Sequence, residues 1–291
     1  MQRYAAFSHC WGEAETLKLL KDNKPRLETG IDISELPQSY KEAIDACLRL
    51  DIKYIWVDSL CIIQDSTDDW RAESATMMHI YGNALLTIAA AAAAESSEPS
   101  FLHRDPLNIP PTAIMVPQEG PGDMPDVPYI LMLGEPLKEI RKAPLCRRAW
   151  VLQESYISNR ILFLADTQLW WECREMLCCE SWPIGIPEEI MGETTNYQGR
   201  NKRYDIQPFH SRWYNLVEEY TRCRLTSFSD KLIAMAGLAS HLQPSIGNDE
   251  YIAGFWRSQL PHALCWGGVF QAYRGIPTNS VQSAFMVVGF S

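Results

Sequence analysis

The chain has 291 residues, of which 46% are hydrophobic and 21% charged, and its formal net charge at pH 7 is −10. That composition and length suit a globular protein with a substantial buried core. No apolar stretch approaches the roughly 18 residues of a membrane span, and the start of the chain does not resemble a secretion signal. The acidic balance, without any Lys/Arg cluster, argues against nucleic acid as a partner. We therefore expect a cytoplasmic protein that binds neither nucleic acid nor membrane.

Nine cysteines are scattered among apolar neighbours, and none forms a Cys-x-x-Cys pair. The densest group, Cys173, Cys178 and Cys179, has no histidine nearby. This usage is typical of buried, reduced thiols in the cytosol, and we favour that interpretation over a zinc site. We expect no bound metal.

The first ninety residues alternate between strand and helix patterns. Apolar runs predict strands, apolar residues at helical spacing predict helices, and in chain order the segments are strand 4–8, helix 37–50, strand 53–58, helix 69–82 and strand 85–90. Such an alternation with short connections predicts a parallel sheet with right-handed crossovers, and hence an α/β fold.

A proline-rich excursion near 95–145 interrupts this alternation, and we expect two short strands in it, at 112–116 and 129–133. Order resumes with a short helix in "CRRAWVLQESYIS". The segments "RILFLA" and "LWWECR" are candidates for a pair of strands. Together these patterns predict an α/β domain over 1–180 with an insertion.

The remainder, 181–291, is expected to be mostly helical and packed on the core. After an irregular region, three segments have amphipathic helical spacing: 212–225, 229–242 and 249–260.

Ligands of open parallel sheets bind beyond the carboxyl ends of the strands. The residues there are "SHCWG", from Ser8 to Gly12, and "DSLC", which begins at Asp58. Trp11 offers a flat ring, and Gly12 permits close backbone approach, so the pair suits a ring-shaped ligand. Trp11 could equally cap the core, and Asp58 could simply brace the next turn.

Other chemistries have weaker support. His9 and Cys10 are neighbours in an extended segment and point to opposite faces, so adjacency does not make them a dyad. A cysteine hydrolase using Cys10 or Cys61 therefore has little geometric basis. The chain also lacks the phosphate loop GxxxxGK[ST] and the dinucleotide fingerprint GxGxxG after a strand, which argues against nucleoside-triphosphate hydrolysis and hydride transfer.

Glu73 lies near the amino end of the predicted helix 69–82, where the helix dipole favours an anion. A fixed carboxylate suits a reaction whose transition state gains positive charge, such as departure of a base from a ribose. The alternative is an ordinary solvated glutamate.

Four ordered motifs resemble the fungal heterokaryon incompatibility (HET) domain from Tyr4 to Cys173. They are "FSHCWG", "LPQSYKEAI", "YIWVDSLCIIQDSTDDWRAESATMMHIYGNALLTIAA" and "RRAWVLQESYISNRILFLADTQLWWEC". Later segments, such as "YIAGFWRSQLPHALCW", resemble the region that usually follows this domain. Beyond Trp266, "YRGIPTNSVQ" does not look like the tryptophan-rich segment found there in such proteins.

The resemblance implies fungal non-self recognition and programmed cell death. It also implies a core similar to the Toll/interleukin-1 receptor (TIR) domain, a flavodoxin-like parallel sheet. Many TIR domains cleave NAD with a glutamate in a Trp-x-x-x-Glu-like pattern. Trp70-x-x-Glu73 is one residue shorter, and Glu73 is the expected catalytic carboxylate; the loop from Ser8 to Gly12 would line the nucleotide pocket.

The motif "RRAWVLQES" holds Trp150 and Glu154 on one helical face, with Gln153 one position round. It could complete the pocket or tie the excursion to the sheet, and Glu154 is the rival carboxylate. Beside Glu73, the residues expected to bind substrate are Ser8, His9, Cys10, Trp11, Gly12, Asp58, Trp70, Gln153 and Glu154.

We therefore predict a NAD(P) nucleosidase that releases nicotinamide. It would need no cofactor, because NAD or NADP is its substrate, and it would form a homo-oligomer or be activated by a partner protein. The alternative is a non-catalytic, self-assembling signalling module of the cell-death pathway.

Overall fold

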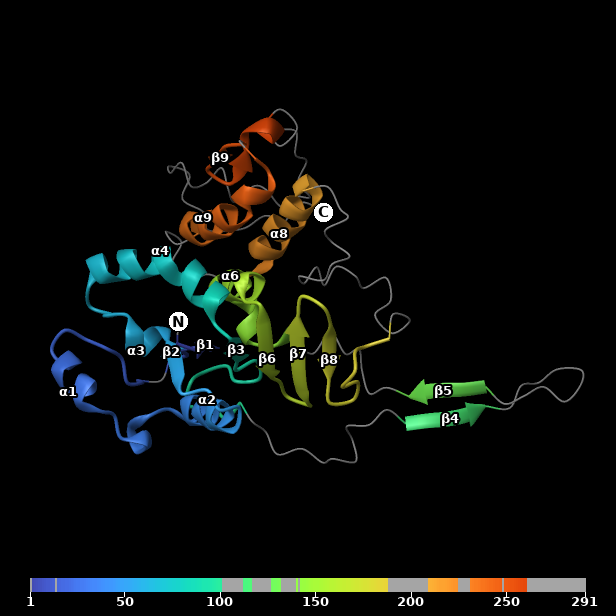
Figure 1. The fold of residues 1–291 in the computed structure, drawn as a ribbon, viewed down its shortest axis with the longest axis horizontal. Helices are drawn as coiled ribbons and strands as arrows, with labels where there is room; N and C mark the ends of the chain where they lie inside the picture. Colours follow the sequence, from blue (N-terminus) through green and yellow to red (C-terminus); the bar gives the residue numbers. More distant parts are fainter. Residues whose placement is uncertain are drawn as a thin grey trace, which may run out of the picture.

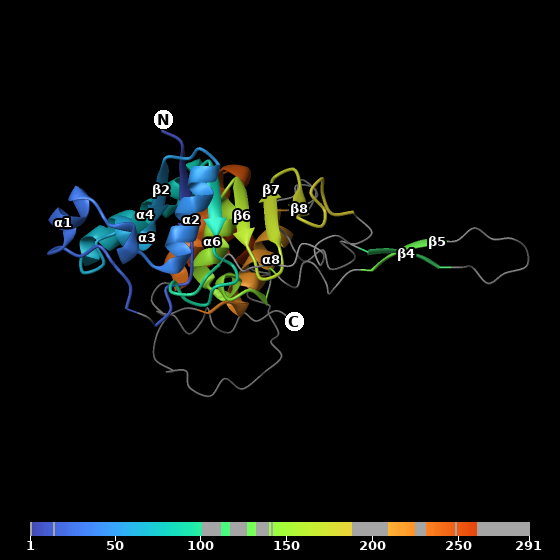
Figure 2. The ribbon, with the colours of Figure 1, turned by 90° about the horizontal axis from the view of Figure 1, so that it is seen from below.

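The computed structural model describes residues 2–13, 15–100, 112–116, 127–131, 140, 142–187, 209–224, 231–247 and 249–260. A six-stranded sheet lies at its centre, in the order β2-β1-β3-β6-β7-β8 (Figures 1 and 2). Its strands are β1 Tyr4–Ser8, β2 Tyr54–Val57, β3 Leu86–Ala89, β6 Arg160–Leu164, β7 Leu169–Cys173 and β8 Leu177–Cys179.

The sheet is mixed but mostly parallel. β1 pairs in parallel with both β2 and β3, and β3 with β6, which confirms the predicted parallel unit. β7 and β8 extend it antiparallel, so the predicted pairing of "RILFLA" with "LWWECR" is also confirmed. The strand β8 was not predicted.

Helices cover both faces of the sheet. On one face lies α2 (Gln38–Arg49); on the other lie α4 (Thr67–Asn83) and α6 (Ala149–Ile157) (Figure 1). Successive side chains of β1 point to opposite faces of the sheet, so this strand contributes to the apolar core on both sides. Ala5 and Phe7 pack in the apolar cluster that includes α2, whereas Ala6 packs in the cluster that includes α4 and α6.

Shorter elements complete the domain. They are the helices α1 (Lys24–Thr29) and α3 (Asp58–Cys61), the 3₁₀ turns η1 (Ile33–Glu35) and η3 (Leu145–Arg147), and the strands β4 (Thr112–Val116) and β5 (Val127–Leu131). β4 and β5 form a separate antiparallel pair. The two strands predicted in the proline-rich excursion are thus confirmed, the second starting two residues earlier than expected.

The C-terminal region contains α8 (Phe209–Arg222) and α9 (Lys231–Leu242), as predicted, followed by the turn η6 (Gln243–Ser245). Both helices share an apolar cluster with α4 and α6. Among the described residues, no helix combines the length and apolar character needed to cross a membrane.

The third predicted helix, 249–260, is wrong. The segment forms a hairpin of β9 (Tyr251–Ile252) and β10 (Phe255–Trp256), then the turn η7 (Arg257–Gln259). Ala253 and Gly254 have φ values of 46° and 107°, and positive φ at both central residues makes a tight hairpin turn.

Candidate functional site

The end of β1 presents consecutive side chains to opposite faces. Ser8 lies on the face covered by α6, and His9 on the face covered by α2, as expected for neighbours in an extended strand. Two polar clusters result, separated by the strand.

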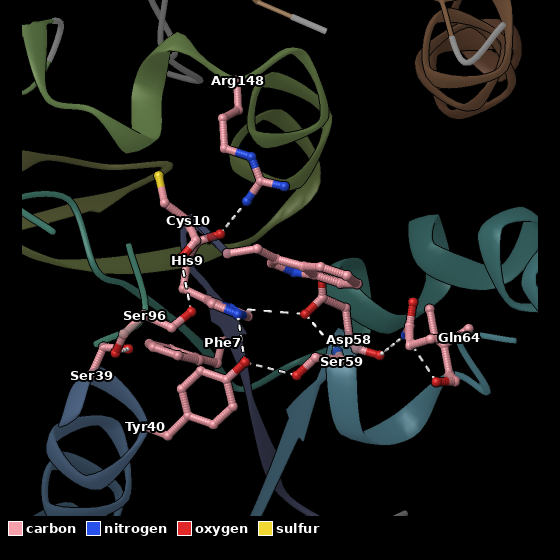
Figure 3. A network of polar contacts seen from close by, with 12 residues as sticks. Phe7, His9, Cys10, Ser39, Tyr40, Asp58, Ser59, Gln64, Ser96 and Arg148 are labelled. Carbon is pink, nitrogen blue, oxygen red and sulfur yellow. Dashed lines mark hydrogen bonds and ion pairs between the residues drawn. The ribbon is translucent and has the colours of Figure 1, made fainter. Parts of the chain in front are cut away.

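The cluster on the α2 face is a chain of neutral groups (Figure 3). A hydrogen bond of 2.8 Å joins His9 Nε2 and the Tyr40 hydroxyl, and another of 2.7 Å joins that hydroxyl to Ser59 Oγ. The His9 ring stacks on Phe7 with ring centroids 4.8 Å apart. These contacts hold the imidazole in a fixed orientation.

Burial controls the protonation of this chain. His9 is 3% exposed, and burial lowers its pKa to about 4, although the nearby Asp58 carboxylate opposes the shift. Burial likewise raises the pKa of Tyr40 to about 12. At neutral pH, both groups are uncharged.

Asp58 links this chain to the predicted ring platform. Its Oδ2 accepts a 2.9 Å hydrogen bond from Trp11 Nε1, and its Oδ1 accepts one of 2.7 Å from the Ser59 backbone N–H. Oδ1 also lies 3.8 Å from His9 Nδ1. Asp58 therefore braces the turn into α3, as one of its two predicted roles required, and it also fixes the indole of Trp11. Its role in substrate binding stays a prediction.

Gly12 occupies a position where a side chain has no room. Its φ is +74°, and an added Cβ would overlap that of Glu95 and lie 2.9 Å from the Glu95 Cα. The Ser96 hydroxyl donates a 2.8 Å hydrogen bond to the Cys10 carbonyl in the same region. The close approach expected at Gly12 is therefore to the protein's own loop after β3.

The cluster on the α6 face is built around Glu154. Glu154 is 6% exposed, and neither its Oε2 nor Ser8 Oγ makes a hydrogen bond of normal geometry to the described residues, although the hydroxyls of Ser8 and Tyr81 lie close enough to act on the carboxyl group. Burial raises the pKa of Glu154 to about 7; the Ser8 hydroxyl and the Arg148 guanidinium oppose the shift, whereas Asp58 adds to it. A carboxyl with this pKa changes its charge near neutral pH.

Arg148 joins the two clusters. It is the N-cap residue of α6, and its Nη1 donates a hydrogen bond to the His9 carbonyl (Figure 3). Cys10 lies close enough for the guanidinium to act on it, but burial dominates and raises the pKa of the Cys10 thiol. A protonated thiol is a poor nucleophile, which does not favour a cysteine hydrolase.

The remaining predicted residues lie on helices. Trp70 meets Trp150 edge to face, with ring centroids 6.5 Å apart, and so connects α4 to α6. Glu73 lies one turn further along α4 and is half-buried; its Oε2 is 3.4 Å from Thr76 Oγ1. Gln153 packs against Gly237 of α9.

The structure thus brings together Ser8, His9, Cys10, Trp11, Asp58 and Glu154. Among the described residues, no hydrogen bond or ring contact connects Glu73 to this group. Tyr40 and Ser59 were missed, whereas Arg148 belongs to the motif "RRAWVLQES", which was expected either to complete the pocket or to tie the excursion to the sheet. One signal could have indicated Tyr40: its predicted helix starts at the sheet edge where β1 ends.

Fold and site together define an α/β protein with its polar residues at the carboxyl ends of parallel strands. The family model for heterokaryon incompatibility protein (HET) matches residues 4–154, more than half of the chain, and this protein belongs to that family. Membership suggests a role in fungal heterokaryon incompatibility and cell death. No curated protein and no solved structure gave a match.

Proposed function

We propose that this protein acts in fungal non-self recognition and programmed cell death by hydrolysing the bond between nicotinamide and ribose in NAD or NADP, with Glu154 as the catalytic carboxylate. One observation carries the proposal: Glu154 is a buried carboxyl beside Ser8 and Arg148 at the carboxyl end of β1, with a pKa of about 7. Strongly perturbed carboxyls in such positions are typical of catalytic sites.

The strand order supports a TIR-like core. The series β2-β1-β3-β6 follows the 2-1-3-4 order of flavodoxin-like sheets, in which ligands bind where β1 and β3 diverge. Trp150 and Glu154 of α6 have the Trp-x-x-x-Glu spacing that the resemblance to TIR domains implies. Trp70 and Glu73 are one residue too close. Spacing and burial therefore both favour Glu154 over Glu73.

The chemistry needs a negative charge near the ribose. As the C1′–N bond breaks, its electron pair passes to the nicotinamide nitrogen, which becomes neutral, and positive charge develops on the ribose. An ionised Glu154 would stabilise that charge. Water then adds to C1′ and loses a proton, giving ADP-ribose, or its 2′-phosphate from NADP, with free nicotinamide and a proton.

Two further residues suit a dinucleotide. Trp11 is partly exposed, and Asp58 fixes its indole, so a flat ring is ready to stack on a base or on nicotinamide. Lys18 Nζ lies 5.1 Å from the centroid of that ring, which adds positive charge where a phosphate could bind.

The test is release of nicotinamide from NAD and from NADP by the purified full chain. We expect release by the natural protein and by Glu73→Gln, and a large loss in Glu154→Gln. If Glu73→Gln instead abolishes release while Glu154→Gln retains it, the catalytic role belongs to Glu73.

The second candidate is a non-catalytic module that self-assembles. Three apolar side chains near β2, at one end of the sheet, favour it: Leu48, Leu50 and Tyr54 are 70%, 50% and 50% exposed. This candidate predicts concentration-dependent assembly that Leu48→Asp abolishes, with no nicotinamide released. Light scattering beside the nicotinamide assay separates the two.

A further inference from the structure

We propose that the C-terminal helical region positions the site: α9, acting through Gly237 on Gln153, sets where α6 holds Glu154. Gln153 is then a positioning residue. The inference builds on the proposed function only for its turnover readout; the placement of Glu154 can be measured separately.

The helix α6 presents two neighbouring stripes of side chains. Trp150, Glu154 and Ile157 follow one another at helical spacing, and they face α4 and the sheet: Trp150 meets Trp70, Glu154 lies by Ser8, and Ile157 lies by Gly82. This stripe contains the site.

The neighbouring stripe faces the C-terminal region. Its members Ala149, Gln153 and Tyr156 each contact α9 or the segment that follows α8. The Ala149 backbone N–H donates a 3.0 Å hydrogen bond to the Arg224 carbonyl, and the Tyr156 ring meets His241 with centroids 6.4 Å apart. α6 is therefore held along its whole length by residues 75 or more positions distant in sequence.

The tightest of these contacts is the one at Gly237. An added Cβ there would overlap Nε2 of Gln153 and lie 3.0 Å from its Cδ. The Gln153 amide ends a flexible side chain, but the side chain is only 3% exposed and cannot turn into solvent. A larger residue at 237 must therefore be accommodated inside the protein, either by a new conformation of the Gln153 side chain or, as proposed, by displacement of α6 or α9.

A displacement of α6 at Gln153 also moves Glu154, because the two residues share the helix backbone. Gln153 and Glu154 are adjacent in α6, so a displacement taken up at the first residue moves the second against Ser8 and Arg148. An enzyme site tolerates little misplacement, since an error of about 1 Å can cost about a hundredfold in rate. The contact at Gly237 therefore adjusts the site without touching substrate.

The experiment compares Gly237→Ala, Gln153→Ala, the double variant and Ser240→Ala. Ser240 is exposed on α9 one turn beyond Gly237, so its substitution is the matched control. Three quantities are measured: the thermal midpoint, kcat and KM for nicotinamide release, and the titration midpoint of the Glu154 carboxyl. Carbon-13 NMR of labelled glutamate follows that titration, with assignment by loss of the signal in Glu154→Gln.

Displacement of α6 admits water, and burial is the main cause of the raised pKa of Glu154. We expect Gly237→Ala to lower the titration midpoint by roughly half a pH unit or more and to lower kcat about tenfold, with KM within about twofold. It should also lower the thermal midpoint. When Gln153 is already alanine, adding Gly237→Ala should raise the thermal midpoint above that of Gln153→Ala alone. The overlap with the Gln153 side chain is then absent, and alanine favours the helix more than glycine does. Ser240→Ala should leave the titration midpoint and kcat unchanged.

An unchanged Glu154 titration in both Gly237→Ala and Gln153→Ala would overturn the inference, leaving a merely structural contact. If Gly237→Ala does not fold, Gln153→Ala decides alone, because it removes the same contact without adding volume. If the natural protein releases no nicotinamide, the proposed function fails, but the NMR titration still decides whether α9 positions Glu154.

Discussion

The two faces of β1 hold their buried polar groups in different ways. On the α2 face, hydrogen bonds join His9 Nε2, Tyr40 and Ser59 as a chain of neutral groups, while His9 Nδ1 has no hydrogen-bond partner among the described residues and lies 3.8 Å from the Asp58 carboxylate. On the α6 face, Glu154 and Ser8 are equally buried, yet each has an oxygen without a hydrogen bond of normal geometry to the described residues. Buried polar groups are normally satisfied because leaving one unpaired costs about 1–3 kcal/mol.

Ser8 and His9 are adjacent residues and are equally buried, so the difference between the two polar clusters does not follow from burial alone. A connected network of neutral groups adds rigidity, whereas a buried carboxyl with an unpartnered oxygen costs stability that a functional role would explain. We interpret the α2 face as support and the α6 face as the reactive side. The predictions below test that division.

The largest expected effect is on turnover. Glu154→Gln keeps the size of the side chain but removes its charge, which should raise the barrier by about 3–4 kcal/mol and slow nicotinamide release by about two to three decades. Glu73→Gln is the matched control and should stay within about twofold of the natural rate. Equal losses in both variants would mean that the reactive side extends to α4.

The second prediction uses pH. The folded pKa of Glu154, about 7, lies above its ordinary value of 4.5, so the folded state binds more protons than the unfolded state between those values. Stability contributed by this group therefore falls as pH rises from 4.5 to about 7, by up to about 3 kcal/mol. Because His9 contributes an opposite slope in nearly the same pH range, the fall should appear as a difference between two proteins. Urea unfolding at several pH values should show the natural protein losing stability relative to Glu154→Gln as pH rises from 4.5 to about 7.

His9 should give the opposite slope. Burial lowers its pKa from 6.5 to about 4, so the folded state binds fewer protons than the unfolded state in that window. Its contribution is complete above pH 6.5 and is lost as pH falls towards 4. His9→Gln should remove this slope and leave that of Glu154. A single shared slope would contradict the separation of the faces.

The third prediction concerns the loop that joins the faces. Gly12 and Gly247 have almost equal φ values, +74° and +69°, but of the two only Gly12 has a neighbour among the described residues within 4 Å of an added Cβ. Gly247→Ala should therefore lose only the free energy of unfolding that alanine costs at positive φ. Gly12→Ala should lose about 2 kcal/mol more, because its Cβ also overlaps Glu95. Urea denaturation measures the difference, and equal losses would show that the loop simply moves aside.

The sequence predicted the elements that repeat a local pattern. The strands β1, β2 and β3 are short apolar runs, and their alternation with helices determined the parallel order. The hairpin at 251–256 was missed because its turn needs Ala253 at positive φ, and alanine gives no signal of that conformation. Tertiary packing, not local propensity, decides such a segment.

The site was predictable where it depends on strand ends. Ser8, Trp11 and Asp58 follow directly from the rule for parallel sheets. The role of Glu154 was harder to rank, because α6 reaches β1 only after the long excursion near 95–145. The contacts of Arg148 and Tyr40 with His9 were missed for a similar reason: they span 139 and 31 residues and depend on how two helices dock.

The smallest expected effect is that of Tyr40→Phe. The change removes one hydroxyl and leaves His9 Nε2 and Ser59 Oγ without the partner that joins them, so it should destabilise the fold by about 1–2 kcal/mol. Tyr54→Phe is the matched control, since Tyr54 is half exposed and should lose almost nothing. Because the α2 face supports the site without entering it, nicotinamide release by folded Tyr40→Phe should stay within about threefold of the natural rate. Fully folded Tyr40→Phe could instead lose as much kcat as Glu154→Gln. That result would mean that His9, Tyr40 and Ser59 take part in catalysis, and it would contradict the assignment of the α2 face to support alone.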